Sequence, residues 1–474
     1  MKETLVPSSW LEKEGRRLDS GPYLSGAIEA RRSIEKLRVP KHCLHTLTKG
    51  HNGGIFNGPQ FVRRYVSEPA HGVRFLTSSS MLIADLAQAD LLRKTDALSP
   101  KLTHLRIEEG MTLISCSGTI GNMVYARPEL VGVWSSQDIL KIVPDPDKVR
   151  PGYVYAFLAS RFGIPLVVGG TYGAIIRHIE PQHVWDLPVP RLDPAVEEEC
   201  HRLVSVAGAQ RTRASELLRE ARERLDEIWG LSTVKALAVQ PPRGPDVVIL
   251  PASKLQGRFD AFFHGTAALE ADRVIFEIGS RIPIRTLGEC ALRVFETPRF
   301  GRISIENPRH GIPFMSIADL ARIDPVSDDY ISKRQVVDMD AEVAAGWLVL
   351  PRVGQLQGLF GHVVCIPPHL HGTAVSDNNI RIVPHNREDS GYLFAALSSD
   401  ICYRQIVRRA CGTSIPYLDS PRVCQIPVPW PEDQTNRARV AIKVNEAMDL
   451  RSEAVRGERL AVSTVEKAIA KGLA

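Results

Sequence analysis

The sequence predicts an α+β protein with two tandem copies of one mixed α/β domain with a twisted sheet, and two long helices packed as an antiparallel coiled-coil pair. Three observations predict this fold class. Short motifs recur about half a chain apart, short apolar runs bounded by turn residues fill each copy, and a helical pattern follows each copy. The 474 residues are 44% hydrophobic and 24% charged, as in globular proteins of two to four domains.

The duplication is visible in motifs that return in the same order with nearly constant spacing. Gly152–Leu158 returns as Gly391–Leu397, an offset of 239 residues (391 − 152). Leu187–Pro190 returns as Ile426–Pro429 at the same offset (426 − 187). The repeated unit is about half of the protein, which indicates a duplicated domain and excludes a solenoid of short repeats.

Each copy contains short apolar runs that predict strands and a short helix. In the first copy we expect strands at Thr112–Cys116 and Gly121–Ala126 and a helix at Tyr153–Ser160. The corresponding segments of the second copy are Trp347–Leu350, His362–Ile366 and Tyr392–Ser399. Each copy closes with an extended Pro-x-Pro segment, because the residue before a proline is driven out of the helical region.

A helical pattern follows each copy. From about Pro194 to Ala238, apolar residues recur every three or four positions, which predicts a long amphipathic helix with one interruption near Gly208. The pattern recurs from Pro431 to Leu473, and both prolines suit the first turn of a helix. Each helix would be roughly 60 Å long at 1.5 Å per residue. Because a small domain cannot cover so long a stripe, we expect the two helices to pack on each other.

These patterns divide the chain into four parts. Residues 1–192 form the first domain, residues 193–239 the central helix, residues 240–430 the second domain and residues 431–474 the C-terminal helix. No stretch approaches the ~20 consecutive apolar residues of a membrane-spanning helix, and the first residues lack the apolar core of a signal peptide. The eight cysteines contain no C-x-x-C pair and are typical of free thiols in a reducing cytosol. The expected location is therefore cytoplasmic, without a membrane partner.

The charge of the chain is mildly basic and unevenly distributed. There are 59 Lys and Arg against 54 Asp and Glu, a net charge of +5, which permits nucleic-acid binding without demanding it. Eight basic residues and one acidic residue lie between Arg31 and Arg64, and a second cationic run extends from Arg281 to Arg309. One such run alone is typical of a solvated face, but a run in each copy favours a shared binding function.

Sequence motifs for catalysis are missing. The chain has no phosphate-binding G-x-x-x-x-G-K-[ST] loop, no zinc-binding H-E-x-x-H and no G-x-S-x-G nucleophile elbow. The segment nearest to the tetrapeptide of amino-methyltransferases, Asn307–His310, lacks its second proline and its aromatic residue. The sequence therefore predicts a chain that is not an enzyme by itself, with no catalytic residue and no bound cofactor.

One cluster in the second copy has residue types that bind Zn²⁺. It consists of His362, Cys365, His369 and His371. The equivalent positions of the first copy hold Asn122, Tyr125, Glu129 and Val131. Because the same element forms there without a ligand set, we expect a strand and a turn with incidental His and Cys, and no metal site.

The motifs also have a recognisable order. In the first copy they are Leu113–Gly121, Ser136–Asp138, Gly170–Gly173 leading to Ile175, and Leu187–Pro190. In the second copy they are Ser376–Asn378, Gly412–Ile415 and Ile426–Pro429, followed by Pro431–Gln434. In this order, and twice, they resemble the specificity subunit of type I restriction-modification systems over essentially the whole chain. The chain departs from that family at Glu197–Glu199, where Glu-Gln is usual, and in an expanded second glycine loop, Val353–Gly361.

The resemblance implies a function. In this family each of two target recognition domains reads one half of a bipartite DNA site, and the helices act as a ruler that fixes the gap between the halves. The helices also dock two copies of an adenine methyltransferase (M) subunit, which is expected to use S-adenosylmethionine. A restriction and translocase (R) subunit can join. The specificity subunit is not enzymatic by itself.

The resemblance also gives the two cationic runs a role as surfaces for double-stranded DNA, since Arg and Lys bind phosphate. We expect most of the selected residues to contact phosphate and one or two in each domain to read guanine. The selected residues are Lys36, Arg38, Lys41, Arg63 and Arg64 in the first copy and Arg299, Arg302, Arg309 and Arg352 in the second.

Two functions of other classes stay open at this point. One is a methyltransferase or nuclease with an unrecognised site, which purified protein that modifies or cuts DNA alone would support. The other is a coiled-coil adaptor whose duplicated domains bind protein partners without reading DNA. Absence of salt-dependent DNA binding would favour the adaptor.

Overall fold

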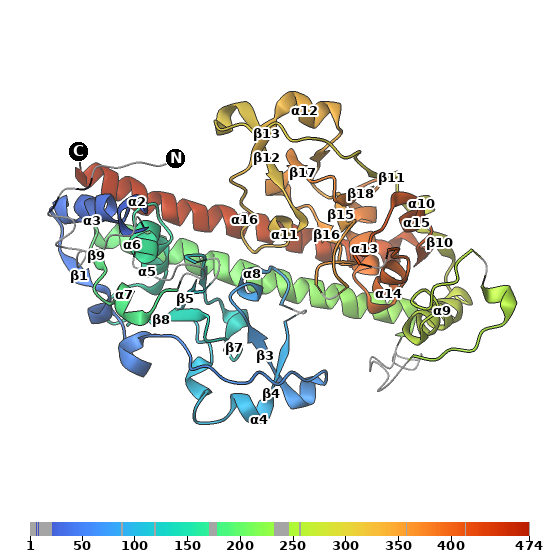
Figure 1. Ribbon diagram of the computed structural model, residues 1–474, viewed down its shortest axis with the longest axis horizontal. Coiled ribbons are helices and arrows are strands. Elements are labelled where there is room, and N and C mark those ends of the chain that lie inside the picture. Colours follow the sequence, from blue (N-terminus) through green and yellow to red (C-terminus); the bar gives the residue numbers. More distant parts are fainter. Residues whose placement is uncertain are drawn as a thin grey trace. The chain divides into compact units, whose positions relative to one another are not determined.

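Figure 1 shows the computed structural model, which describes Val6, Ser8 and residues 21–86, 89–117, 120–169, 178–231, 246–255, 257–356, 358–412 and 414–473. Contacts divide the chain into two compact units. Unit 1 comprises Met1–Thr212 and Glu453–Ala474, and unit 2 comprises Arg213–Ser452. Each unit therefore contains one domain together with one part of each long helix. The motif residues Gly118, Thr119, Gly170–Gly173, Ile175 and Thr413 lie outside the described residues.

The two long helices are α8 (Pro194–Trp229) and α16 (Gln434–Leu473). The start of α8 at Pro194 agrees with the prediction, but α16 begins at Gln434 and not at Pro431. The reason is that Asp433 accepts a hydrogen bond from the Thr435 backbone N–H (2.9 Å) and so caps the first turn. At its other end α8 stops at Trp229, where Gly230 adopts a left-handed φ of 68°. The expected last turns, within residues 232–245, lie outside the described residues.

The predicted interruption of the central helix near Gly208 is wrong, because α8 is continuous through this residue. A Cβ atom at position 208 would lie 3.3 Å from the Cβ atom of Arg127 and 3.7 Å from the ring of Tyr125. The glycine therefore allows the chain around β6 to approach the helix closely, and it does not break the helix.

The two long helices pack against each other in both units, as predicted. In unit 1 the Cys200 thiol lies 3.6 Å from the Ala461 carbonyl, and the Gln210 side chain donates to Glu453 (2.8 Å). Later residues of α8 thus meet earlier residues of α16, so the packing is antiparallel. In unit 2 the two stripes share one apolar core. That core includes Ala214, Leu217 and Ala221 from α8 and Val440, Val444 and Ala447 from α16.

Buried polar contacts accompany this packing in unit 1. The Arg211 guanidinium forms an ion pair with Glu458, and both side chains are buried. The Tyr155 hydroxyl also donates to Glu458 (3.4 Å), which links the short helix of the domain to the helix pair. Because a buried charge without its partner is costly, this contact favours one register of the helices.

Unit 1 contains a four-stranded antiparallel sheet in the order β2-β8-β5-β6 and a three-stranded sheet in the order β4-β3-β7, in which β3 and β7 are parallel. A further antiparallel pair, β1 and β9, joins the start of the domain to the Pro-x-Pro segment. The strands are β1 Lys41–Cys43, β2 Ile55–Phe56, β3 Gly72–Leu76, β4 Leu91–Arg93, β5 Thr112–Ser115, β6 Met123–Tyr125, β7 Trp134–Ser135, β8 Ile139–Ile142 and β9 Pro188–Pro190. The shorter helices are α2 Gly21–Leu24, α3 Ala27–Lys36, α4 Lys94–Ala97, α5 Pro151–Leu158, α6 Gly163–Gly169 and α7 Pro181–Trp185.

Unit 2 repeats this topology, which confirms the α+β class and the duplication. Its sheets have the orders β11-β18-β15-β16 and β13-β12-β17-β14, with β12 and β17 parallel, and β10 pairs with β19. The strands are β10 Ile284–Thr286, β11 Arg293–Glu296, β12 Gly311–Met315, β13 Tyr330–Ser332, β14 Glu342–Val343, β15 Leu348–Pro351, β16 Val364–Cys365, β17 Thr373–Val375, β18 Asn379–Val383 and β19 Pro427–Pro429. The shorter helices are α9 Thr266–Gly279, α10 Leu287–Cys290, α11 Ile317–Leu320, α12 Lys333–Asp338, α13 Arg387–Leu397, α14 Asp400–Arg408 and α15 Ser420–Cys424.

The repeated glycine motif is where each domain touches its own long helix. In unit 1 a Cβ atom at Gly152 in α5 would lie 2.8 Å from the Cα atom of His201 in α8. In unit 2 a Cβ atom at Gly391 in α13 would lie 2.7 Å from the Cα atom of Ala441 in α16. Both distances are too short for a side chain, so only glycine permits this contact between a short helix and a long one.

The tyrosine after each of these glycines connects the Pro-x-Pro strand to the short helix by a hydrogen bond. Tyr153 and Tyr392 are fully buried, and their hydroxyls donate to the carbonyls of Pro190 and Pro429. The Tyr392 hydroxyl also accepts a hydrogen bond from the indole N–H of Trp229 at the end of α8 (3.0 Å). The recurring motif is thus a structural joint between the strand, the short helix and the long helix.

The helices α5 and α6 are short and apolar. Among the described residues no single helix has the length and apolar composition to span a membrane, whereas α5 and α6 together, bent by 73°, have both. Tyr153, Phe157, Leu166 and Val167 of this pair are part of the buried core of unit 1.

We expect Gly391→Ala to lower the free energy of unfolding by about 1–3 kcal/mol, because the added methyl group meets the backbone of Ala441 in a packed interface. This cost exceeds the roughly 1 kcal/mol that alanine gains over glycine in a helix. Urea denaturation followed by circular dichroism measures the difference. Gly301→Ala is the control, since no atom lies within 4 Å of the position that its Cβ would take. Equal stability of Gly391→Ala and the unmodified protein would contradict the close contact.

Candidate nucleic-acid interface

The structure separates the five cations selected in unit 1 into two groups. Lys36 and Arg38 are exposed at the end of α3, beside Lys41, the first residue of β1. The Lys41 ammonium donates to the carbonyls of Glu35 (3.2 Å) and Leu37 and so covers the C-terminal end of α3. Lys41 therefore has a structural role in addition to its predicted one.

Arg63 and Arg64 form the second group, in the segment between β2 and β3. The Arg64 guanidinium binds Asp96 with two hydrogen bonds, from Nε (3.0 Å) and Nη2 (2.9 Å). Asp96 also accepts two bonds from Arg93 (3.2 and 2.8 Å). The hydrogen bonds from Arg93 and Arg64 lower the pKa of Asp96, so this cluster of two guanidinium groups and one carboxylate carries one net positive charge.

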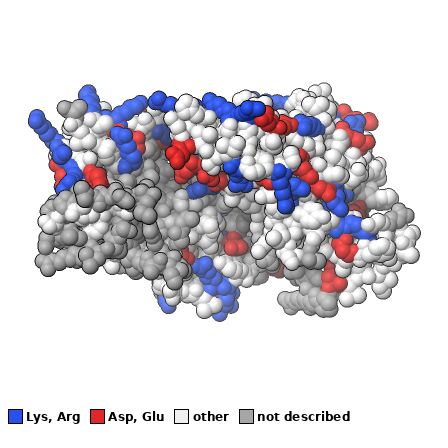
Figure 2. Space-filling view, turned by 45° about the horizontal axis from the view of Figure 1, so that its top comes forward, with Lys and Arg blue, Asp and Glu red and all other residues white. Residues whose placement is uncertain are grey.

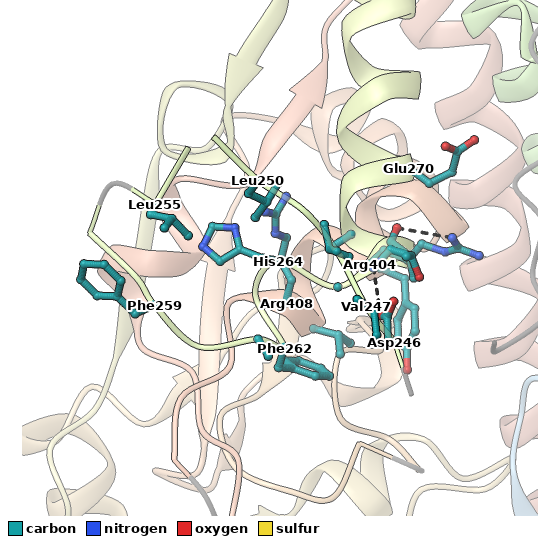
Figure 3. Close-up of a pocket in the computed structure, with 18 residues that line it drawn as sticks. Asp246, Val247, Leu250, Leu255, Phe259, Phe262, His264, Glu270, Arg404 and Arg408 are labelled. Carbon is teal, nitrogen blue, oxygen red and sulfur yellow. Dashed lines mark hydrogen bonds between the residues drawn. The ribbon is translucent and has the colours of Figure 1, made fainter. Parts of the chain in front are cut away.

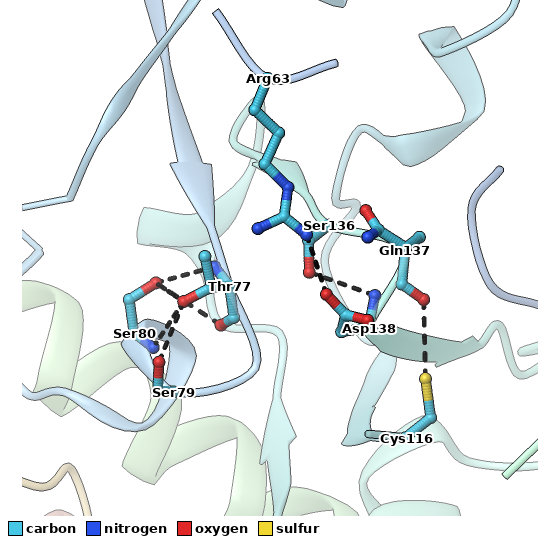
Figure 4. Close-up of polar contacts among 8 residues, drawn as sticks. All are labelled: Arg63, Thr77, Ser79, Ser80, Cys116, Ser136, Gln137 and Asp138. Atoms are coloured by element: carbon cyan, nitrogen blue, oxygen red, sulfur yellow. Dashed lines mark hydrogen bonds and ion pairs between the residues drawn. The ribbon is translucent and has the colours of Figure 1, made fainter. Parts of the chain in front are cut away.

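Arg63 meets a different carboxylate. Its Nη2 atom lies 2.8 Å from Oδ2 of Asp138, and its guanidinium carbon lies 5.7 Å from the centre of the Phe75 ring. Figure 4 shows Arg63 pointing toward Asp138, on the turn that also carries Ser136 and Gln137. Asp138 is the last residue before β8, and its backbone N–H donates to the Ser136 hydroxyl (3.2 Å). This turn therefore holds the carboxylate in a fixed position.

A second cluster of polar groups lies to one side of this ion pair in Figure 4. The Thr77 backbone N–H donates to the Ser80 hydroxyl (2.8 Å), and the Thr77 hydroxyl lies 3.1 Å from that of Ser79. The side-chain oxygen of Gln137 is buried without a hydrogen-bond partner among the described residues. We call the residues drawn in Figure 4 the Arg63 corner. They are Arg63, Thr77, Ser79, Ser80, Cys116, Ser136, Gln137 and Asp138.

Unit 2 has an equivalent arrangement around Arg302. Arg302 follows Arg63 by 239 residues (302 − 63), and its guanidinium carbon lies 4.5 Å from the centre of the Phe314 ring. Its Nη2 atom lies 3.8 Å from Oδ1 of Asp377, whose side chain is only 11% exposed. Arg302 itself is 47% exposed, so its guanidinium is open to a ligand.

Of the other cations selected in unit 2, the structure brings Arg352 near Asp377. The Arg352 backbone N–H donates to the carbonyl of Asn378 (2.8 Å), and its guanidinium lies 3.6 Å from Glu296. Arg299 and Arg309 are exposed in the segment between β11 and β12. We call Arg302, Arg352, Asp377 and Asn378 the Arg302 corner.

Sequence reasoning missed a buried cation in the middle of each four-stranded sheet. Lys141 in β8 is fully buried and donates to the Ile139 carbonyl (2.9 Å), and its burial lowers its pKa to about 7. Arg381 in β18 is also fully buried and donates to the carbonyls of Asn379 (3.1 Å) and Val375 (2.8 Å). The signal was a basic residue inside an apolar strand at the same place in both copies. Because both side chains are enclosed, they do not reach a ligand at the surface.

The four residues considered for zinc have separate partners. His362 stacks on Tyr403 with the ring centres 4.6 Å apart. The Nδ1 atom of His369 lies 2.9 Å from the Ser452 hydroxyl, and His371 accepts from the Ala345 backbone N–H (3.3 Å). Cys365 is buried. Within the described part of the chain, one group places three potential metal ligands within 4.8 Å of one another: Cys43, His45 and Asp186. In that group His45 Nδ1 already contacts the Trp185 carbonyl (3.1 Å).

A cavity of about 1270 Å³ lies elsewhere in unit 2, between the segment that precedes α9 and the helices α9 and α14 (Figure 3). Its walls are mainly apolar, and Phe259 at its edge is 85% exposed. The two arginines at the cavity are already bonded within the unit: Arg404 donates to the Ala267 carbonyl (3.4 Å) and Arg408 to Asp272 (2.6 Å). This lining suits an apolar group and does not suit phosphate.

Figure 2 shows Lys and Arg side chains interspersed with Asp and Glu on the face that it draws. On α8 Arg202, Arg213, Arg219 and Arg224 each form an ion pair with a glutamate of the same helix. The two corners therefore differ from the helix surface in combining a partly exposed arginine with an aspartate and a side-chain amide from one turn.

Solved structures to which the chain is similar include subunits of one kind of complex. The S subunit of a type I restriction-modification system from M. genitalium is 14% identical with a TM-score of 0.37, over 91% of this chain and 96% of that chain. The HsdS subunit from Thermoanaerobacter tengcongensis is 13% identical with a TM-score of 0.27, over 92% and 95%. A chain from a study of complex assembly and conformational transition of the type I R-M system is 15% identical with a TM-score of 0.26, over 91% and 98%. No family model and no curated protein matches the chain. All three TM-scores are below 0.5.

We expect the buried Lys141 to make stability depend on pH. Between pH 7 and pH 10 the unfolded chain keeps the proton of this lysine whereas the folded protein has lost it, so the free energy of unfolding rises with pH. The slope from one such group is at most about 1.4 kcal/mol per pH unit.

Lys141→Met should remove this rise, which urea denaturation at several pH values measures. Lys101→Met, at an exposed position, is the matched control and should keep the profile of the unmodified protein. Parallel profiles for Lys141→Met and the unmodified protein would show that the lysine does not lose its proton in the fold.

Proposed function

We propose that the chain is the DNA sequence-specificity subunit of a type I restriction-modification complex, or of a related defence complex. The observation that carries the proposal is the recurrence of one arrangement in both units. In each, a partly exposed arginine lies over a phenylalanine ring and beside an aspartate, next to the same four-stranded sheet. Two equivalent corners in one chain suit two half-sites on one DNA molecule.

The cations around each corner provide the affinity for DNA. Phosphate contacts supply most of the binding free energy and position the protein, whereas a few side chains at base edges read the sequence. In unit 1 this assigns phosphate to Lys36, Arg38, Lys41 and Arg64. In unit 2 it assigns phosphate to Arg299, Arg309 and Arg352.

In this proposal the two long helices set the spacing between the half-sites. With 36 and 40 residues, α8 and α16 are about 54 and 60 Å long at 1.5 Å per residue. One turn of duplex is ~34–36 Å. A helix pair of this length suits a ruler that leaves unread base pairs between two half-sites.

The proposed partners follow from this role. Two M subunits dock on the helices and bring S-adenosylmethionine, and R subunits join in a restricting complex. The chain itself binds no cofactor and catalyses no reaction in this proposal, and it acts in the cytoplasm, where the DNA is.

A second candidate is a duplicated-domain coiled-coil adaptor that binds protein partners without reading DNA. The apolar cavity of unit 2 favours it, because Phe259 and its neighbours offer a surface that fits an apolar side chain of a protein better than a nucleic acid (Figure 3). The two functions differ in salt dependence, since DNA binding through phosphate contacts weakens steeply as salt rises.

Sequencing of the methylated bases in host DNA, with and without the gene for this chain, tests the proposal. We expect deletion to abolish adenine methylation at one motif made of two short sequences with a fixed gap. Restoring the gene should restore that motif. An unchanged set of methylated motifs after deletion, together with no salt-dependent DNA binding by the purified chain, would favour the adaptor.

A further inference from the structure

An aspartate lies beside the arginine of both corners, although the two aspartates do not occupy equivalent positions in the repeated sequence. The strands β8 and β18 correspond at an offset of 240 residues, as Lys141 and Arg381 show (381 − 141). The aspartates are 239 residues apart (377 − 138), so Asp377 comes from a position one residue earlier in its turn than Asp138. Each aspartate nevertheless lies beside the equivalent arginine.

A carboxylate at a DNA surface is unfavourable by itself, because the phosphates repel it. Its effect on the arginine beside it is a gain that offsets this repulsion. A guanidinium held by an aspartate has fewer conformations to lose when it binds, and its remaining N–H groups point in a fixed direction. At Arg63, which is hydrogen-bonded to Asp138 at 2.8 Å, the aspartate thus converts a flexible cation into a positioned donor, and at Arg302 the aspartate attracts the guanidinium at 3.8 Å without a hydrogen bond.

The two neighbouring arginines of unit 1 differ in how their aspartates hold them, because Asp96 is shared between Arg64 and Arg93 whereas Asp138 binds Arg63. Arg64 uses both Nε and Nη2 to bind Asp96, which occupies one edge of its guanidinium. Among the described residues Arg63 makes one side-chain hydrogen bond, from Nη2 to Asp138, so one complete edge of its guanidinium, with two neighbouring N–H groups, remains for a ligand. Guanine presents two acceptors, O6 and N7, to the major groove, and a guanidinium binds both at once.

We propose that Arg63 and Arg302 are the base-reading side chains of the two domains, that each reads a guanine, and that Asp138 and Asp377 are the positioning residues that orient them. This inference rests on the proposed function and deepens it. It assigns Arg64 to phosphate, although Arg64 is adjacent to Arg63 and more exposed.

The test uses the full-length chain purified with its methyltransferase partner. Binding is measured on the duplex that carries the methylated motif and on duplexes in which each base pair is changed singly. We expect Arg63→Lys to keep the salt dependence but to lose discrimination at one G·C pair of one half-site, by roughly 5- to 150-fold. Lysine retains the charge but not the planar fork. Arg302→Lys should do the same in the other half-site only.

The matched controls are Arg64→Ala and Asp96→Asn, which alter the other Arg–Asp pair of the same segment. Arg64→Ala should weaken binding about equally on all duplexes and reduce the salt slope by about one. Asp138→Asn should reduce discrimination at the base pair that Arg63 reads, whereas Asp96→Asn should not. Unchanged readout of the second half-site in the Arg63 and Asp138 variants shows that these proteins are folded.

Three results separate the inference from the function on which it rests. Full discrimination by Arg63→Lys would overturn the inference and make Arg63 a phosphate contact. Loss of discrimination in Arg63→Lys with none in Asp138→Asn would overturn the positioning role of the aspartate. If the unmodified complex shows no preference for any duplex, the proposed function itself is wrong.

Discussion

The apolar stripe along α8 and α16 is the constraint on which the rest of the structure depends. Val204 and Ala461 in unit 1 and Leu217 and Val444 in unit 2 are nearly or fully buried, so each core is built from one domain and from parts of both helices. Helices of this length cannot bury their stripes within the domains that precede them. For this reason the compact units do not end where the domains end in the sequence, and each unit boundary falls inside a long helix.

The sequence carried enough information to predict the duplication, the strands and the helix pair, because apolar periodicity and turn residues are local signals. The sequence was insufficient where the role of a residue depends on a contact that the local pattern does not show. The sequence pattern predicts a break in the helix at Gly208, but the role of this glycine is to make room for Tyr125 and Arg127, which are far away in the chain. The start of α16 depends on the side chain of Asp433 and not on the proline before it.

The candidate site was less predictable than the fold. Counting charges located the cationic runs, but it could not distinguish Arg63 from Lys41, whose ammonium covers the end of α3. The carboxylate that holds Arg63 is 75 residues away in the chain, and the pairings of β2 with β8 and of β3 with β7 bring the two segments together. The burial of Lys141 could not be predicted for the same reason, since burial is a property of the assembled sheet.

The central claim is that the helix pair sets the distance between two half-sites, and the most direct measurement changes its length. Seven residues would be inserted in each helix, between Thr212 and Arg213 and between Ser452 and Glu453, where the unit boundary preserves the contacts within each unit. Seven residues are nearly two whole turns, so the stripes keep facing each other, and they add about 10.5 Å. At ~3.4 Å per base pair, sequencing of methylated DNA should show a gap about three base pairs longer with both half-sequences unchanged. A methylating complex with the original gap would contradict the account.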